Sequence, residues 1–406
     1  MMVLGSLLSV RLLTEILSPD AYGELALGMT VASLINQIIL GPLSGGIARF
    51  YAPAAEHNDL FAFLNAAKRL AFNATGMILL IILISIISLI LLARPQWIAI
   101  AVSALIFAIF SGYSAIFSGI QTAARQRATV AMHQGLEPLL RLIIAVGLLT
   151  WLGTTSEIAM IGYAFASLLI LASQIFFFRK AIHIPPSKNT KKNWREEIWK
   201  FSWPIGMFGI FTWLQLASDR WALQALSSTS EVGNYAVLYQ LGYYPISLVT
   251  GMLMQFIVPI LYQRAGDTTD MSRNRNATRL CWQIFWATLL ITGLASLIAE
   301  YLHTFIFQIL VAKEYSTVSY LLPWMILSGG VFAAGQALAT NLQAKLKTQE
   351  MITAKITTAI LGLALNFISA YYFKITGVVF SGLIFSVTFL VWMIILVNRE
   401  NKRECL

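Results

Sequence analysis

Two pairs of opposite charges lie inside stretches of the sequence that are otherwise apolar. Asp219 and Arg220 are adjacent in LQLASDRWALQALSS (214–228), and Glu137 and Arg141 are four residues apart in HQGLEPLLRL (133–142). A carboxylate in apolar surroundings can take up a proton, and the planar guanidinium of arginine donates two parallel hydrogen bonds to a phosphate. A charge at the centre of a bilayer costs about 2.5–3.5 kcal/mol on insertion scales, so charges kept in membrane spans are candidates for function.

The composition of the chain indicates a polytopic membrane protein. Of its 406 residues 58% are hydrophobic and 11% charged, and the mean hydropathy is +0.74, whereas soluble domains have about 25% charged residues. The net charge of +10 does not indicate a nucleic-acid partner, because the basic residues lie between apolar spans. The sequence has no P-loop motif, and its two cysteines and four histidines are too scattered to predict a metal site.

Twelve stretches are long and apolar enough to cross a bilayer, whose ~30 Å core needs about 20 helical residues. We expect spans near residues 2–17, 22–48, 70–93, 96–122, 128–152, 156–178, 200–226, 232–260, 279–301, 318–344, 348–372 and 375–398. The predicted fold class is therefore an all-α polytopic membrane protein with twelve transmembrane helices. The first span is short, and we expect it to be truncated by about two turns.

The distribution of lysine and arginine predicts the orientation of these spans. With the N-terminus inside, most of the 28 basic residues fall on cytoplasmic segments, one of which contains Lys345, Lys347 and Lys355. Only three basic residues fall on the opposite side: Arg94, Lys313 and Lys374. By the positive-inside rule, both termini should be cytoplasmic.

A sequence repeat relates the two halves of the chain. RLLTEILSPDAYG (11–23) and RWALQALSSTSEVG (220–233) each run from an arginine through Leu-Ser to a glycine, and further glycines, Gly41 and Gly251, follow eighteen residues later. SGYSAIFSGIQTAARQR (111–127) similarly resembles SGGVFAAGQALATNLQAKLK (328–347). Duplicated halves are typical of transporters that alternate access. We therefore expect an N-lobe at 1–178, a cytoplasmic linker at 179–199, a C-lobe at 200–398 and a cytoplasmic tail at 399–406, with the two six-helix lobes around a central cavity.

Several segments resemble a known superfamily of membrane transporters. The segments are RLLTEILSPDAYGELAL (11–27), GPLSGGIARFYA (41–52), SWPIG (202–206), ASDRWALQAL (217–226) and EVGNYAVLYQL (231–241). In these segments, and over nearly its whole length, the chain resembles the multidrug/oligosaccharidyl-lipid/polysaccharide (MOP) exporter superfamily. The similarity is to its polysaccharide transporter branch, which includes the O-antigen flippases.

This resemblance implies a flippase and not an enzyme. Such a protein would move an undecaprenyl-diphosphate-linked oligosaccharide, the repeat unit of an O-antigen, capsule or exopolysaccharide, from the cytoplasmic to the periplasmic leaflet of the bacterial inner membrane. A drug/cation antiporter of the same superfamily is the alternative. A membrane-embedded glycosyltransferase is a rival of another class, but it would need clustered carboxylates in a long loop. Three arginines against two acids within the spans favour an anionic substrate over a cationic one.

The resemblance also implies roles for the charged residues. We expect the diphosphate to be bound by four arginines: Arg11, Arg220, Arg141 and Arg49. Arg11 and Arg220 would be equivalent residues of the two halves. Asp219 and Glu137 would couple transport to a proton or sodium gradient. For each group a structural role remains open, since Asp219 and Arg220 could extend to the outer interface, Glu137 and Arg141 could neutralise each other, and Arg49 could be a membrane anchor.

Polar rows along the helices are the remaining candidates for the cavity lining. One row contains Ser111, Ser114, Ser118 and Gln121; Gln134 shares a face with Glu137 and Arg141; and Tyr239, Tyr243 and Ser247 form another row. Such rows either bind sugars or join helices. We expect no cofactor and no metal ion, and we expect a monomer whose partners are the lipid-linked oligosaccharide and a glycan polymerase or assembly machinery.

Overall fold

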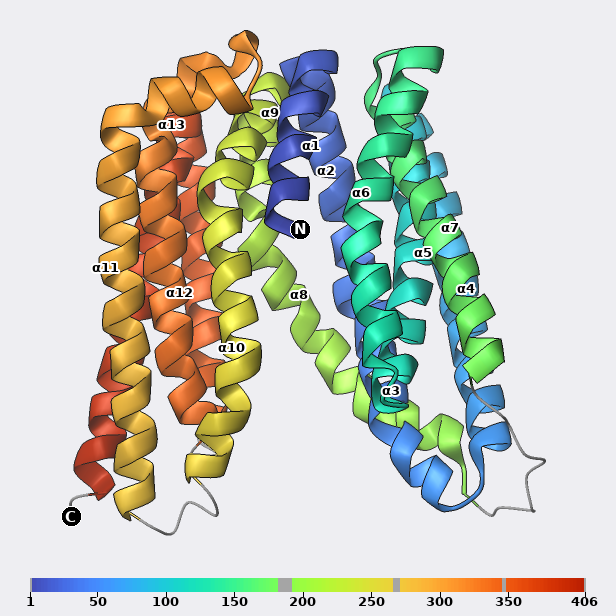
Figure 1. Ribbon diagram of the computed structural model, residues 1–406. Helices are drawn as coiled ribbons and strands as arrows, with labels where there is room; N and C mark the ends of the chain where they lie inside the picture. Colours follow the sequence, from blue (N-terminus) through green and yellow to red (C-terminus); the bar gives the residue numbers. More distant parts are fainter. Residues whose placement is uncertain (1, 182–191, 266–270, 345–347, 405–406) are drawn as a thin grey trace. The chain divides into compact units, whose positions relative to one another are not determined.

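The structure, a computed structural model, describes residues 2–181, 192–265, 271–344 and 348–404, and these residues form helices and no strands (Figure 1). The helices are α1 (Met2–Ile16), α2 (Pro19–Ile35), α3 (Gly41–Glu56), α4 (Leu60–Leu91), α5 (Ile98–Ala123), α6 (Arg127–Leu152), α7 (Ser156–Ala181), α8 (Trp194–Leu226), α9 (Thr229–Leu238), α10 (Tyr244–Ala265), α11 (Met271–Leu310), α12 (Leu322–Ala344) and α13 (Thr348–Glu404). The all-α polytopic fold class is confirmed.

Each of the predicted spans corresponds to a helical segment within these ranges. A π-helical turn at Asn36–Leu40 joins α2 to α3, and another at Tyr239–Tyr243 joins α9 to α10. Helix α13 holds two spans, which are separated at Lys374, where φ is 50°. In the described part of the chain, eight helical segments are long and apolar enough to cross a membrane.

The chain forms two compact units, whose boundaries differ from those of the predicted lobes. Unit 1 comprises residues 1–5 and 24–213, and unit 2 comprises residues 6–23 and 214–406. Most of α1 and the start of α2 therefore pack with the C-terminal helices, and α8 contributes to both units. The division into six-helix lobes at 1–178 and 200–398 stays a prediction.

In unit 1, α5 packs against α3 and α7, and small residues allow close contact between helices. A Cβ atom on Gly162 of α7 would lie 3.0 Å from the backbone nitrogen of Ala145 in α6. At the start of α8, the indole Nε1 of Trp194 donates a hydrogen bond to the buried carboxylate of Asp59. Trp213 Nε1, further along α8, donates to Thr30 O at 2.7 Å. These bonds fix the first part of α8 within unit 1.

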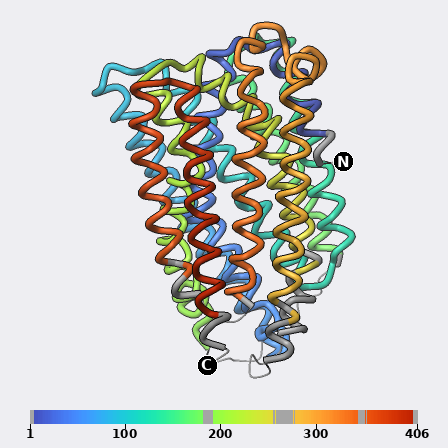
Figure 2. Tube along the Cα trace, turned by 90° about the vertical axis from the view of Figure 1, so that its left-hand side faces the viewer, coloured from blue at the N-terminus to red at the C-terminus, as the bar shows by residue number. Residues whose placement is uncertain are grey.

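In unit 2, α11, α12 and the two spans of α13 lie side by side (Figures 1 and 2). Their core contains Phe285, Leu338, Leu342, Phe389 and Met393, all at most 3% exposed. In a bilayer such side chains hold helices together by van der Waals packing, because lipid tails are as apolar as leucine. This core joins α11, α12 and α13 to one another, whereas the charged pair of unit 2, Asp219 and Arg220, lies on α8.

The outer surface of α4 is apolar. Leu79, Leu80, Leu83 and Ile84 are each more than half exposed. A continuous apolar face of this size is unfavourable in water but suits contact with lipid. The helix is therefore a lipid-facing element of a multi-pass membrane protein.

Candidate functional site

Unit 1 contains a cavity of ≈ 650 Å³ between α5 and α6. Its polar lining residues are Ser111, Ser114, Ser118 and Thr122 from α5 and Gln134, Glu137 and Arg141 from α6. Residues three, four or seven apart share a face of a helix, so each helix presents one row of polar side chains. The structure thus brings two of the polar rows from the sequence to a single cavity. Thr122, which sequence reasoning missed, continues the serine row by one more turn.

Glu137 and Arg141 form an ion pair in this cavity. Ser167 of α7 donates a hydrogen bond to Glu137 Oε1 at 3.3 Å and lies 3.5 Å from an Arg141 terminal nitrogen. The guanidinium carbon of Arg141 lies 4.7 Å from the ring centroid of Phe107, a cation–π contact. The pair makes the cavity polar but electrically neutral.

Further amides hold the hydroxyl groups of the α5 row. Gln174 Nε2 donates to Ser118 Oγ at 2.9 Å, and Asn36 Nδ2 donates to Ser111 Oγ at 3.1 Å. Gln121, the last residue of the predicted row, is fully buried outside the lining, and its amide atoms have no partner among the described residues. Arg49 is exposed on α3 and is likewise outside the lining.

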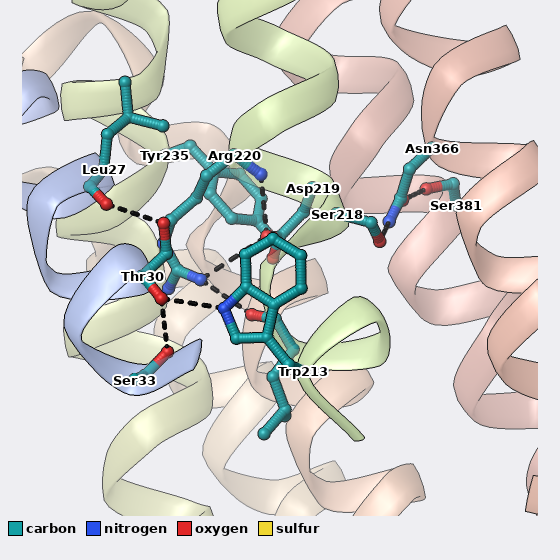
Figure 3. Close-up of polar contacts among 11 residues, drawn as sticks. Leu27, Thr30, Ser33, Trp213, Ser218, Asp219, Arg220, Tyr235, Asn366 and Ser381 are labelled. Atoms are coloured by element: carbon teal, nitrogen blue, oxygen red, sulfur yellow. Dashed lines mark hydrogen bonds and ion pairs between the residues drawn. The ribbon is translucent and has the colours of Figure 1, made fainter. Parts of the chain in front are cut away.

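In unit 2, the acid–base pair of α8 is largely buried, and Figure 3 shows its polar contacts. The side chains of Asp219 and Arg220 are each 11% exposed, and an Arg220 terminal nitrogen lies 3.4 Å from Asp219 Oδ1. The phenol of Tyr235 donates to Asp219 Oδ2 at 2.6 Å. The guanidinium of Arg220 also donates to Leu216 O at 2.9 Å and lies 4.4 Å from the ring centroid of Tyr239. This burial argues against a side chain that extends into water.

A cavity of ≈ 40 Å³ lies beside this pair, with room for only a few water molecules. Its lining includes the predicted residues Asp219, Tyr239 and Tyr243, but not Ser247, which is partly buried on α10. Asn366 of α13 also lines it and donates to Ser218 Oγ at 2.8 Å, while Ser381 donates to the Asn366 side-chain oxygen (Figure 3). Sequence reasoning missed Asn366, although a lone amide in an apolar span is itself a signal.

Arg11 lies elsewhere in unit 2, against the end of α11. It forms an ion pair with Glu15 and donates to Val311 O at 2.8 Å. A cation in this position satisfies the free carbonyl groups at a helix C-terminus and interacts favourably with the helix dipole. Arg11 and Arg220 therefore have different partners, and both belong to unit 2, whereas the repeat places one in each half.

Comparison with known families adds to these observations. A family model described as polysaccharide biosynthesis protein matches residues 3–264, more than half of the chain. No curated protein sequence matches the chain.

Several solved structures with a similar fold are described as flippases or transporters. The chain is similar to a structure described as "Lipid II flippase MurJ, inward closed conformation", with a TM-score of 0.74 and 15% identity over 98% of this chain and 85% of that one. It is similar to an inward-facing multidrug resistance MATE family transporter of the MOP superfamily (TM-score 0.68, 13% identity, 98% and 96% covered). The Vibrio cholerae MATE transporter VcmN in the bent form is a further neighbour (TM-score 0.61, 12% identity, 99% of both chains). Identities this low show the fold alone. The family match shows that the chain belongs to the polysaccharide biosynthesis protein family, in agreement with the polysaccharide transporter branch that its sequence resembles.

Proposed function

We propose that this protein is a flippase for an undecaprenyl-diphosphate-linked oligosaccharide. The observation that carries the proposal is the cavity of ≈ 650 Å³ in unit 1, a volume within the usual range of about 300–1,000 Å³ for ligand sites. Its hydroxyl and amide groups can donate to and accept from the hydroxyl groups of a sugar. The family match and the transporter fold support the same conclusion.

The charge of the cavity favours a glycan over a cationic drug. Glu137 is the only acidic residue in the lining, and Arg141 neutralises it. A cation/drug antiporter would instead need a carboxylate free to hold the positive charge of its substrate. The neutral cavity suits the uncharged part of a lipid-linked oligosaccharide. This supports a flippase over a cation/drug antiporter.

The remaining parts of the proposal concern location and driving force. The protein would lie in the bacterial cytoplasmic membrane with both termini in the cytoplasm, and Glu137 or Asp219 would couple transport to a proton or sodium gradient. The arginines Arg11, Arg49, Arg141 and Arg220 remain candidates for contact with the diphosphate. Of these, Arg49 has no ion-pair partner among the described residues.

Deletion of the gene in its host tests this function. We expect loss of surface glycan and accumulation of a lipid-linked oligosaccharide that enzymes added to the periplasmic face of spheroplasts cannot reach. The parent gene should restore the glycan, whereas Ser114→Leu, which fills the cavity, should not. The matched control is Leu83→Ala on the lipid-facing surface of α4, which should complement fully. Unchanged surface glycan in the deletion strain, together with reduced efflux of ethidium, would favour the antiporter instead.

A further inference from the structure

A lysine lies on the inward face of α13 in unit 2. Lys355 lies two residues after the start of the candidate span Thr353–Glu400 and is partly buried. Gly362 and Asn366, seven and eleven residues further on, share its helix face and line the small cavity beside Asp219. Lys355 therefore points toward the interior of unit 2 and not toward lipid.

Neighbouring side chains agree with this orientation. Ala354, which precedes Lys355, and Thr358, one turn after it, are fully buried. Ile360 and Ile368, on the opposite side, are each 57% exposed. Met351 and Ala354 belong to the apolar core that α13 forms with α11 and α12. The sequence predicts that Lys355 lies near the cytoplasmic end of the span 348–372, and the structure places it in α13.

Lys355 differs from the arginines of the spans because no described residue forms an ion pair with it. Arg11, Arg141 and Arg220 each form an ion pair with a carboxylate. Every other lysine and arginine whose side chain the structure describes is exposed. Within that set, Lys355 is the one cation that is both partly buried and without an ion-pair or hydrogen-bond partner for its amine. An ammonium group in apolar surroundings is unfavourable unless an anion joins it.

We propose that Lys355 is an anion site of unit 2 and that its ammonium group binds the diphosphate of the transported lipid. This inference rests on the proposed flippase function, and it names the residue that holds the charged part of the substrate. Lysine binds phosphate as a compact point charge with three donors, and its flexible stem can follow a moving headgroup. With the N-terminus in the cytoplasm, Lys355 would lie at the cytoplasmic end of its span, where the headgroup enters.

Binding of farnesyl diphosphate, a short lipid diphosphate without sugar, tests the site. The full chain is placed in phosphatidylcholine nanodiscs and titrated by calorimetry with farnesyl diphosphate, farnesol and inorganic pyrophosphate. We expect Lys355→Gln to weaken the affinity for farnesyl diphosphate about tenfold or more and to reduce its dependence on salt concentration. Lys355→Arg should retain the affinity to within about threefold, since it keeps the charge. Farnesol binding should be the same in all variants.

The matched control is Arg279→Gln, which removes an exposed cation from α11 of the same unit. It should bind farnesyl diphosphate like the parent. The proposal is overturned if the parent does not bind farnesyl diphosphate, or if Lys355→Gln binds it as tightly as the parent does. Pyrophosphate binding as tight as that of farnesyl diphosphate would overturn the assignment to a lipid headgroup in favour of a free phosphate. Failure of the flippase function is distinguishable, since it would leave surface glycan unchanged in the deletion strain while diphosphate binding persisted.

Discussion

Gly23 and Gly233 lie directly against each other in unit 2. A Cβ atom on Gly23 would lie 3.0 Å from the backbone nitrogen of Gly233 and would overlap Thr229 O; one on Gly233 would lie 3.1 Å from the nitrogen of Gly23 and would overlap Pro19 O. Each glycine is the fifth residue of its helix, α2 or α9. Reciprocal contacts of this kind are expected between two copies of a repeat that are related by a two-fold axis. The glycines are also the equivalent residues of the sequence repeat.

Substitution of either glycine by alanine should therefore separate α2 from α9. We expect Gly23→Ala and Gly233→Ala each to destabilise the protein by about 1–3 kcal/mol, as overpacking does. Thermal unfolding of detergent-solubilised protein measures the effect. Gly293→Ala in α11 is the control, because a Cβ atom added there would have no atom within 4 Å beyond its own stretch of helix, and the better helix propensity of alanine should make it neutral or slightly stabilising. Equal unfolding temperatures for the three variants would show that the close contact does not matter.

The same glycines show how far the sequence predicts this molecule. Hydropathy predicts the spans because every apolar stretch must be helical in lipid, and the repeat singles out Gly23 and Gly233 without revealing that they touch. The partners of Arg11 on α11 are distant in the chain and depend on packing, which no local pattern contains. For Lys355, hydropathy predicts a position near the cytoplasmic end of a span, but it cannot tell whether a charge near the end of a helix faces water, lipid or protein.

The ion pair of the unit 1 cavity predicts a non-additive pair of substitutions. Glu137→Gln leaves the charge of Arg141 uncompensated, and Arg141→Gln leaves that of Glu137. We expect each single substitution to cost about 1–3 kcal/mol of stability, toward the lower end because the two side chains are 20% and 25% exposed. The double variant should recover part of this loss and part of the surface glycan. Additive losses in unfolding temperature and in glycan would argue that the two charges act separately.

The buried network of α8 leads to a prediction for Arg220. Arg220→Ala removes a charge partner of Asp219, whose carboxylate then keeps the hydroxyl of Tyr235 and the amide of residue 220 as donors. We expect Arg220→Ala to abolish complementation of the deletion strain and Arg220→Lys to be less harmful. Adding Asp219→Asn to Arg220→Ala should restore thermal stability, since no uncompensated charge remains. Restored glycan in the double variant would mean that Arg220 has only a structural role, whereas stability without glycan would support a role in transport.

An unpaired lysine in apolar surroundings should reduce the stability of the empty protein. Lys355→Met keeps the length of the side chain, removes the charge and extends the apolar core around Met351 and Ala354, so we expect a higher unfolding temperature and weaker farnesyl diphosphate binding in the same variant. Binding sites commonly reduce stability in this way. Farnesyl diphosphate should raise the unfolding temperature of the parent, because a ligand that binds only the folded state stabilises it, and should leave that of Lys355→Met nearly unchanged. If Lys355→Met instead unfolds at a lower temperature and still responds to the ligand, the lysine contributes to packing and does not bind the substrate.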